Sequence, residues 1–195
     1  MFDAVGLTCF PGEETSIEYL LGYMCSNIAD MYVKMLNPSL SYTVGTIGNL
    51  PFIYDNSKEK NIKFLVRQCV DIAKQEYQSY EISTEFIRHP LISVISKNCM
   101  PFDNIDLAEC YKCWKNECDD RFNQLKENEE ELNRIFIDIY GLQNELTPEV
   151  EDKDITVRKA DLGRDIRSLI SFAVGCMFGR YSYRADEADG SQIRQ

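Results

Sequence analysis

An uninterrupted helical pattern from Asn104 to Tyr140 constrains the fold of this chain more than any other feature of its sequence. Its apolar residues recur at the spacing of one helix face, and Gly141 follows at the position where helices commonly end in the left-handed conformation. We therefore expect one long helix near 104–140 that packs with other helices. The apolar face of its second half consists of Leu125, Leu132, Ile135, Phe136, Ile139 and Leu142.

The same helix concentrates negative charge. Residues 101–160 contain sixteen Asp and Glu against eight Lys and Arg, and the whole chain has a net charge of −11. This balance argues against a general affinity for the phosphate backbone of nucleic acids, which clustered Lys and Arg provide. The acidic residues predict a solvated outer face; a docking surface for a basic partner domain and mimicry of DNA are the alternatives.

The sequence predicts a cytoplasmic protein without a membrane span. No run of eighteen apolar residues is present, and Met1-Phe2-Asp3 begins neither a basic nor an apolar segment of a signal peptide. The eight cysteines are therefore expected to be reduced, free thiols, because the cytosol keeps thiols reduced.

Further helices are predicted by apolar periodicity and by capping residues. They span residues 16–36, 58–80 and 161–178, with Thr15 or Ser16, Ser57 and Asp161 as caps. Asn37-Pro38 ends the first of them, since the residue before a proline is pushed out of the helical region. Thr147-Pro148 predicts the start of a short helical turn.

Short extended segments are predicted between the helices. Leu40, Tyr42 and Val44 alternate before a turn at Gly45, a second extended piece ends near Tyr54, and "DITV" at 154–157 is a third candidate. Residues 89–104 are expected to be irregular or briefly extended, with prolines as helix breakers. The predicted fold class is therefore mainly α with a few short β strands (α+β), the strands forming a small, incomplete sheet. The chain divides into 1–56, 57–102, 103–182 and a frayed tail, 183–195.

Cys110, Cys113 and Cys118 form the one spacing in the sequence that is typical of a metal site. A structural zinc ion needs four ligands, and Cys99 or His89 could supply the fourth. The three cysteines lie within a helical pattern, however, and no glycine or proline turn accompanies them. Core thiols are the preferred interpretation, and no metal is predicted.

No complete catalytic motif is present. His89 is the single histidine and is interpreted as a turn or packing residue, since no G-x-S-x-G, phosphate-binding or dinucleotide-binding motif accompanies it. Asn37-Pro38 begins like the Asn-Pro-Pro-Tyr loop of adenine amino-methyltransferases, which holds a flipped-out base. Ser39 and Leu40 stand where that loop has its second proline and its aromatic residue. The pair is therefore interpreted as a helix stop.

Two blocks of the sequence resemble a known family. "LLGYMCSNIADMYVKMLNPSLSYTVGTIGNLPFI" (residues 20–53) resembles the closing segment of target-recognition domains in restriction-modification proteins. "LKENEEELNRIFIDIYGLQNELTPEVEDKDITVRKADLGRDIRSLISFAVGCMFGRYS" (residues 125–182) resembles the C-terminal helical region of large adenine-specific DNA methyltransferases. These include the PglX methyltransferases of BREX phage-defence systems and the fused type IIG restriction-methylase enzymes. After Tyr181 the sequence departs from the family.

The resemblance implies S-adenosylmethionine-dependent N6-methylation of adenine at a specific site in double-stranded DNA. The family's catalytic and cofactor-binding domain would precede these residues, so the chain itself is expected to bind no cofactor. Residues 1–56 would close a target-recognition domain, 57–102 would connect, and 103–182 would be a helical scaffold. The chain would be a fragment, a truncated product or a split subunit, and a non-catalytic DNA-recognition and scaffold portion of the parent enzyme. The alternative is a stand-alone acidic interaction protein, such as a DNA mimic or a regulator.

Two groups of residues are predicted to contact DNA on this interpretation. The first follows the first predicted helix and consists of Lys34, Ser41, Tyr42, Thr43 and Asn49. The second is a basic cluster with phosphate contact as its role, consisting of Arg158, Lys159, Arg164 and Arg167. For the second group, pairing with Asp161 and Asp165 on the protein surface is the alternative.

Overall fold

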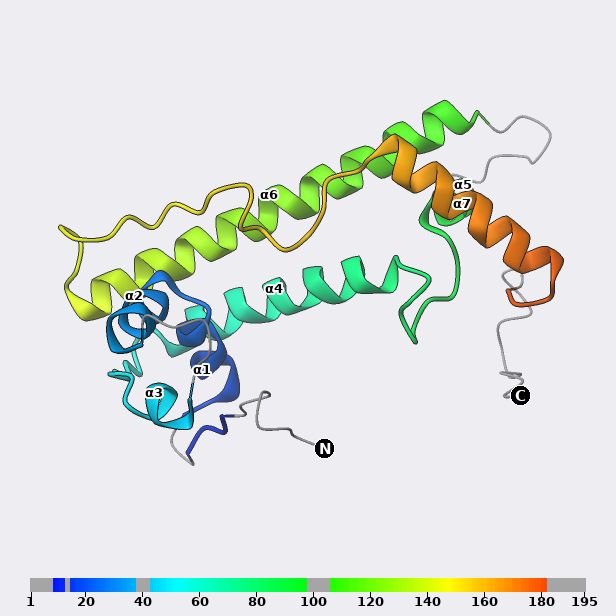
Figure 1. Ribbon diagram of the computed structural model, residues 1–195. Coiled ribbons are helices and arrows are strands. Elements are labelled where there is room, and N and C mark those ends of the chain that lie inside the picture. The colour runs from blue at the N-terminus through cyan, green and yellow to red at the C-terminus, as the bar shows by residue number, and fades with distance from the viewer. Residues whose placement is uncertain (1–8, 13–14, 38–42, 98–105, 182–195) are drawn as a thin grey trace. The chain divides into compact units, whose positions relative to one another are not determined.

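The computed structural model describes residues 9–12, 15–37, 43–97 and 106–181 (Figure 1). Within these ranges the regular structure is helical, and no strand is found. The described residues contain seven helices: α1 (Ile17–Met24), α2 (Asn27–Leu36), α3 (Val44–Gly48), α4 (Glu59–Gln78), α5 (Pro90–Lys97), α6 (Leu107–Tyr140) and α7 (Leu162–Met177). The chain forms two compact units, of residues 1–71 with 124–155 (unit 1) and of residues 72–123 with 156–195 (unit 2). Helices α4 and α6 each continue from one unit into the other.

The predicted β strands and small sheet are wrong for the described residues. At residues 43–49 the side chain of Thr43 accepts a hydrogen bond from the backbone N–H of Thr46, at 3.2 Å, and caps α3. Val44, predicted as the end of a strand, is instead the first residue of this helix. Leu40 and Tyr42 lie outside the described residues. The cap gives the backbone a local hydrogen-bond partner, so it competes with pairing to a distant strand.

Tyrosine hydroxyls take the place of a neighbouring strand at residues 50–54. Tyr23 and Tyr140 donate to the carbonyl oxygen of Pro51, at 2.8 and 2.6 Å. The Ile53 N–H donates to the Tyr140 hydroxyl at 3.0 Å, and the Ile53 carbonyl accepts from Tyr19 at 3.2 Å. The extended backbone is therefore satisfied by side chains of α1 and α6 and needs no sheet.

Neither the helical turn predicted at Thr147-Pro148 nor the strand predicted at 154–157 forms. Side chains of α6 hold residues 148–150 of the segment before α7. Asn133 donates to the Pro148 carbonyl at 3.1 Å, and the Val150 N–H donates to the Glu130 carboxylate at 3.3 Å. Side chains on α6 thus fix this segment as an irregular strap along part of unit 1.

Two helix predictions also need correction. The single helix predicted over 16–36 is two helices, because Ser26 adopts an extended conformation and its side chain caps α2 at the Ala29 N–H. The segment that was predicted to be irregular contains α5, in which Pro90 is the first residue. Proline suits that position, because its missing N–H has no partner there in any helix.

The ranges of the remaining predicted helices are confirmed, but Ser57, predicted as the cap of the helix over 58–80, donates its hydroxyl to Asp55 at 2.7 Å. Helix α4 lies within the predicted range 58–80, and α6 occupies 107–140 of the predicted 104–140. Gly141 has a φ of 68° and ends α6, as expected for a left-handed cap. The side chain of Asp161 accepts the Arg164 N–H at 2.7 Å and begins α7.

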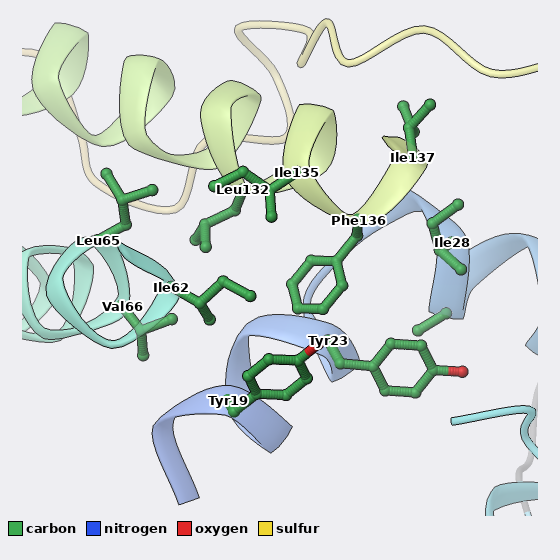
Figure 2. Close-up of a cluster of buried hydrophobic side chains, with 11 residues drawn as sticks. Tyr19, Tyr23, Ile28, Ile62, Leu65, Val66, Leu132, Ile135, Phe136 and Ile137 are labelled. Atoms are coloured by element: carbon green, nitrogen blue, oxygen red, sulfur yellow. The ribbon is translucent and has the colours of Figure 1, made fainter. Parts of the chain in front are cut away.

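Aromatic side chains form the centre of unit 1 (Figure 2). Phe136 of α6 is fully buried and points toward Tyr19 and Tyr23 of α1, with ring centroids 5.6 and 6.0 Å apart in edge-to-face geometry. Helix α1 lies close to α4 at Gly22, where an added Cβ would come within 2.9 Å of the Val66 Cγ2 atom. The small residue therefore allows the two helices to approach.

The core of unit 2 is smaller and contains sulfur. Leu91, Cys110, Trp114 and Cys118 are buried together, which agrees with the interpretation of these cysteines as core thiols. Cys99, considered as a fourth zinc ligand, lies outside the described residues. In the part of the chain that the structure describes, no group of three His, Cys, Asp or Glu side chains is arranged to hold a metal ion. Nor does any helix there combine the length and apolarity needed to cross a membrane.

Candidate functional site

A pocket of about 150 Å³ in unit 2, lined by charged as well as aromatic residues, is the candidate site. It is lined by the end of α4, by the residues that begin α5, by one aromatic residue of α6, and by α7 with the segment before it. The lining residues are Glu76, Ser79, Tyr80, His89, Pro90, Trp114, Arg158, Arg164, Asp165 and Ser168. Two buried carboxylates, of Glu76 and Asp165, determine its chemistry.

The Glu76 carboxylate has three hydrogen-bond or ionic partners. The Tyr80 hydroxyl donates to it, the backbone N–H of Arg158 donates at 3.2 Å, and the Arg121 guanidinium lies 3.7 Å away. Burial and the neighbouring Glu76 raise the pKa of Tyr80 well above its ordinary value, so the hydroxyl remains a donor at neutral pH. A buried carboxylate is tolerated because these groups compensate for lost hydration.

Asp165 is compensated from three directions as well. The Trp114 indole Nε1–H donates to it at 3.2 Å, the Asp161 backbone N–H at 3.1 Å, and the Arg164 Nε–H at 2.9 Å. The contact with the Asp161 N–H ties the cap of α7 to the pocket. Asp165 therefore joins α6 to the start of α7.

His89 is buried and neutral at physiological pH. Burial lowers the pKa of its imidazole to about 4, although the nearby Asp165 and Glu81 charges act in the opposite direction. Its Nδ1 accepts the Leu91 N–H at 3.3 Å, and its ring lies 6.2 Å from that of Phe172. These are the contacts of a packing residue, as the sequence predicts, and they fix the proton on Nε2.

Two of the four predicted basic residues, Arg158 and Arg164, line this pocket, whereas Lys159 follows Arg158 in the chain without being a lining residue. The Arg158 guanidinium lies over the Tyr80 ring at 4.7 Å, and the Lys159 ammonium lies over the Phe122 ring at 4.1 Å. Arg164 donates to the Lys159 carbonyl at 3.0 Å and pairs with Asp165, so the alternative of pairing on the protein applies to this residue. Arg167 is exposed on α7 and does not line the pocket.

The first predicted group belongs to unit 1. Lys34 on α2 is exposed and pairs with Asp30 one turn earlier, at 2.7 Å. Thr43 caps α3, and Asn49 is the exposed residue that ends it. The other two members, at positions 41 and 42, lie outside the described residues.

Glu76, one of the two carboxylates of the pocket, was not predicted from the sequence. Glu76 continues the buried face of α4, four residues after Ile72 and seven after Cys69. The available signal was a carboxylate at a position where the apolar stripe of α4 predicts a buried residue. A carboxylate at such a position is buried only when it is paired. Apart from Tyr80, one turn later, the partners of Glu76 come from α6 and from residue 158, which no local pattern indicates.

Comparison with known proteins gives a consistent result. No protein-family profile matches the chain. The adenine-specific methyltransferase PglX of Lacticaseibacillus casei (strain Zhang) is 40% identical over 182 residues, which cover 93% of this chain. The adenine-specific methyltransferase BrxX of Escherichia coli O9:H4 (strain HS) is 27% identical over 202 residues, again 93% of the chain. The aligned region is 15% of the length of either relative. The resemblance found in the sequence is thus confirmed: over nearly all of its length the chain is similar to one segment of adenine-specific methyltransferases of the PglX and BrxX type.

Proposed function

We propose that this chain is a non-catalytic DNA-recognition and scaffold portion of a site-specific N6-adenine DNA methyltransferase of a phage-defence system. The observation that carries the proposal is the 40% identity to PglX over 93% of the chain. S-adenosylmethionine and the reacting adenine would be held by other parts of the enzyme. Double-stranded DNA in the cytoplasm would be the substrate.

The geometry of unit 2 supports a scaffold role. The carboxylates of the pocket are engaged in contacts that join α4, α6 and the start of α7, and the histidine is neutral and packed. Such an arrangement holds helices in register, whereas acid–base catalysis needs a group that exchanges protons near neutral pH.

Arg158 and Lys159 support the DNA-recognition role. Both are exposed, and each has an aromatic ring beneath its charge. Residues 156–167 carry four basic and two acidic side chains in a chain whose net charge is −11. Exposed cations such as Arg158 and Lys159 suit phosphate contacts, which orient a protein on DNA.

The methylation role is tested by mapping N6-methyladenine in the genome of source cells. We expect that an in-frame deletion of the codons for residues 15–181 removes methylation at one DNA motif, and that a wild-type copy of the gene restores it. The purified 195-residue chain alone is expected to methylate no DNA. A genome methylated identically with and without the segment would contradict the proposal and favour a stand-alone acidic interaction protein.

The DNA contact is tested by the salt dependence of DNA binding, measured with the native protein that carries the segment. Each phosphate contact contributes a slope of roughly 0.9 in log Kd against log salt, so the Arg158→Ala/Lys159→Ala double variant should lower the slope by about 2. Lys153→Ala is the control, because Lys153 is exposed and paired with Glu151. An unchanged slope in the double variant would remove these two residues from the DNA interface.

A further inference from the structure

Helix α7 has apolar side chains on two faces. Its inner face contains Phe172, which is buried, and the half-buried Ile166 and Leu169. A second face, which we call the outer face of α7, is exposed. Its members follow the spacing i, i+4, i+7 and i+8, with exposed fractions of 58% for Ile170, 44% for Val174, 84% for Met177 and 85% for Phe178.

The end of α7 is well defined, so this exposure does not come from a loose helix end. Gly179 has a φ of 73°, and its N–H donates to the Cys176 carbonyl at 3.0 Å while the Arg180 N–H donates to that of Gly175 at 2.8 Å. Tyr181 then folds back on the inner face and stacks on Phe172, with ring centroids 5.2 Å apart. These paired bonds are a standard helix C-terminal motif, and they hold the outer face in place.

An exposed apolar stripe of this spacing is typical of a helix that inserts into a groove. Helices that are apolar all round are normally covered on all sides, and anchors at i, i+4 and i+7 are how an amphipathic helix binds an apolar groove. Contiguous apolar surface of this kind marks an interaction site on an otherwise polar protein.

Charge and composition decide between possible occupants of this face. A second copy of the chain is disfavoured, because each copy carries a net charge of −11 and two such chains repel. Residues 182–195 contain only Tyr183 and Ile193 as large apolar residues, too few to cover four anchors. The relatives, by contrast, have 85% of their length outside the aligned segment.

We propose that the outer face of α7 docks into an apolar groove on the methyltransferase body, meaning the part of the enzyme outside residues 1–195. This inference rests on the proposed function and names the surface through which the scaffold is attached. Arg167 is exposed on α7 three residues before Ile170, at the start of the stripe, so the rim of the groove there is expected to present carboxylates or carbonyl oxygens.

Photo-crosslinking in source cells tests the docking. The codon for Phe178 in the native gene is replaced so that a photoreactive phenylalanine analogue is incorporated, which keeps an aromatic ring at an exposed position. Lys112, exposed on α6 in the same unit, is the control position. We expect crosslinks from position 178 to peptides of an S-adenosylmethionine-dependent methyltransferase outside residues 1–195, several-fold more than from position 112. Ile170→Gln together with Val174→Gln should reduce this yield several-fold, since Gln keeps the helix propensity and removes the apolar surface.

Three results would overturn the docking inference: crosslinks between two copies of the chain, crosslinks confined to residues 1–195, or a yield no higher than that of the control position. Mapping of N6-methyladenine in the same cells separates the two proposals. Methylation that depends on the segment, combined with any of these three results, refutes only the docking. Absence of segment-dependent methylation refutes the proposed function itself.

Discussion

Glu129 on α6 should make the stability of the chain fall as pH rises. The side chain is half-buried in unit 1, and burial raises the pKa of its carboxyl from an ordinary 4.5 to about 7. The folded state therefore holds a proton that the unfolded state releases at lower pH. Stability is fully present below pH 4.5 and is lost as pH rises toward 7, because ionisation in the folded state requires charging a desolvated group.

The size of the effect follows from the pKa. A change from 4.5 to about 7 corresponds to roughly 3 kcal/mol at alkaline pH, since one pKa unit is worth about 1.4 kcal/mol. Partial exposure allows water to screen the charge, so we expect about 1–2 kcal/mol. The neighbouring thiols of Cys25 and Cys69 stay protonated between pH 5 and pH 8, so they add no pH dependence of their own. Burial, and secondarily Glu129, raises the pKa of Cys25 and brings that of Cys69 to about 11.

Urea unfolding of the purified chain at pH 5 and pH 8 measures this effect. Relative to the wild type, Glu129→Gln should gain about 1–2 kcal/mol of unfolding free energy between the two pH values, because Gln cannot ionise. Glu127→Gln, at an exposed position on the same helix, is the matched control and should follow the wild type. If the unfolding free energy of Glu129→Gln changed between pH 5 and pH 8 by the same amount as that of the wild type, ionisation of Glu129 would not affect stability.

Three further substitutions test the packing of the two units by urea unfolding. Phe136→Ala should cost about 3–5 kcal/mol by emptying the centre of unit 1, and Phe64→Ala, at an exposed position, should cost far less; equal losses would contradict the assigned core. Gly22→Ala should destabilise by about 1–2 kcal/mol despite its better helix propensity, because the new Cβ meets Val66, and a gain in stability would show that α1 and α4 are not this close. Asp165→Ala should cost about 2–4 kcal/mol by leaving its buried donors unpaired, and a neutral result would show that the pocket network does not hold α7.

Local signals predicted the long helices. Helices α4, α6 and α7 each have a sustained apolar period, and the Asp161 cap of α7 and the Gly141 end of α6 lie where expected. The break inside residues 16–36 was missed because Ser26 interrupts the helix through its own side chain while the apolar period continues across it. The alternation at 154–157 matches the burial of Ile155 and Val157, but it did not indicate which groups the backbone there pairs with, and Val44, at the end of the other alternating segment, is exposed.

Long-range partners explain what the sequence could not reveal. The backbone of residues 50–54 is satisfied by tyrosine hydroxyls from as far away as Tyr140, and only the folded chain brings them together. In the pocket, the basic residues were visible as a cluster of sequence neighbours. The roles of Glu76 and Trp114 could not be predicted in this way, because their contacts with Arg158 and Asp165 join residues 51 or more positions apart.

The most direct test is to determine the identity and mass of the polypeptide that carries residues 125–160 in source cells. An antibody to that segment captures the polypeptide, and mass spectrometry under denaturing and native conditions analyses it. We expect these residues to belong to, or to be held by, an S-adenosylmethionine-dependent adenine methyltransferase, with a total mass several-fold above 22.6 kDa. A 22.6 kDa chain captured without any methyltransferase peptides would contradict it.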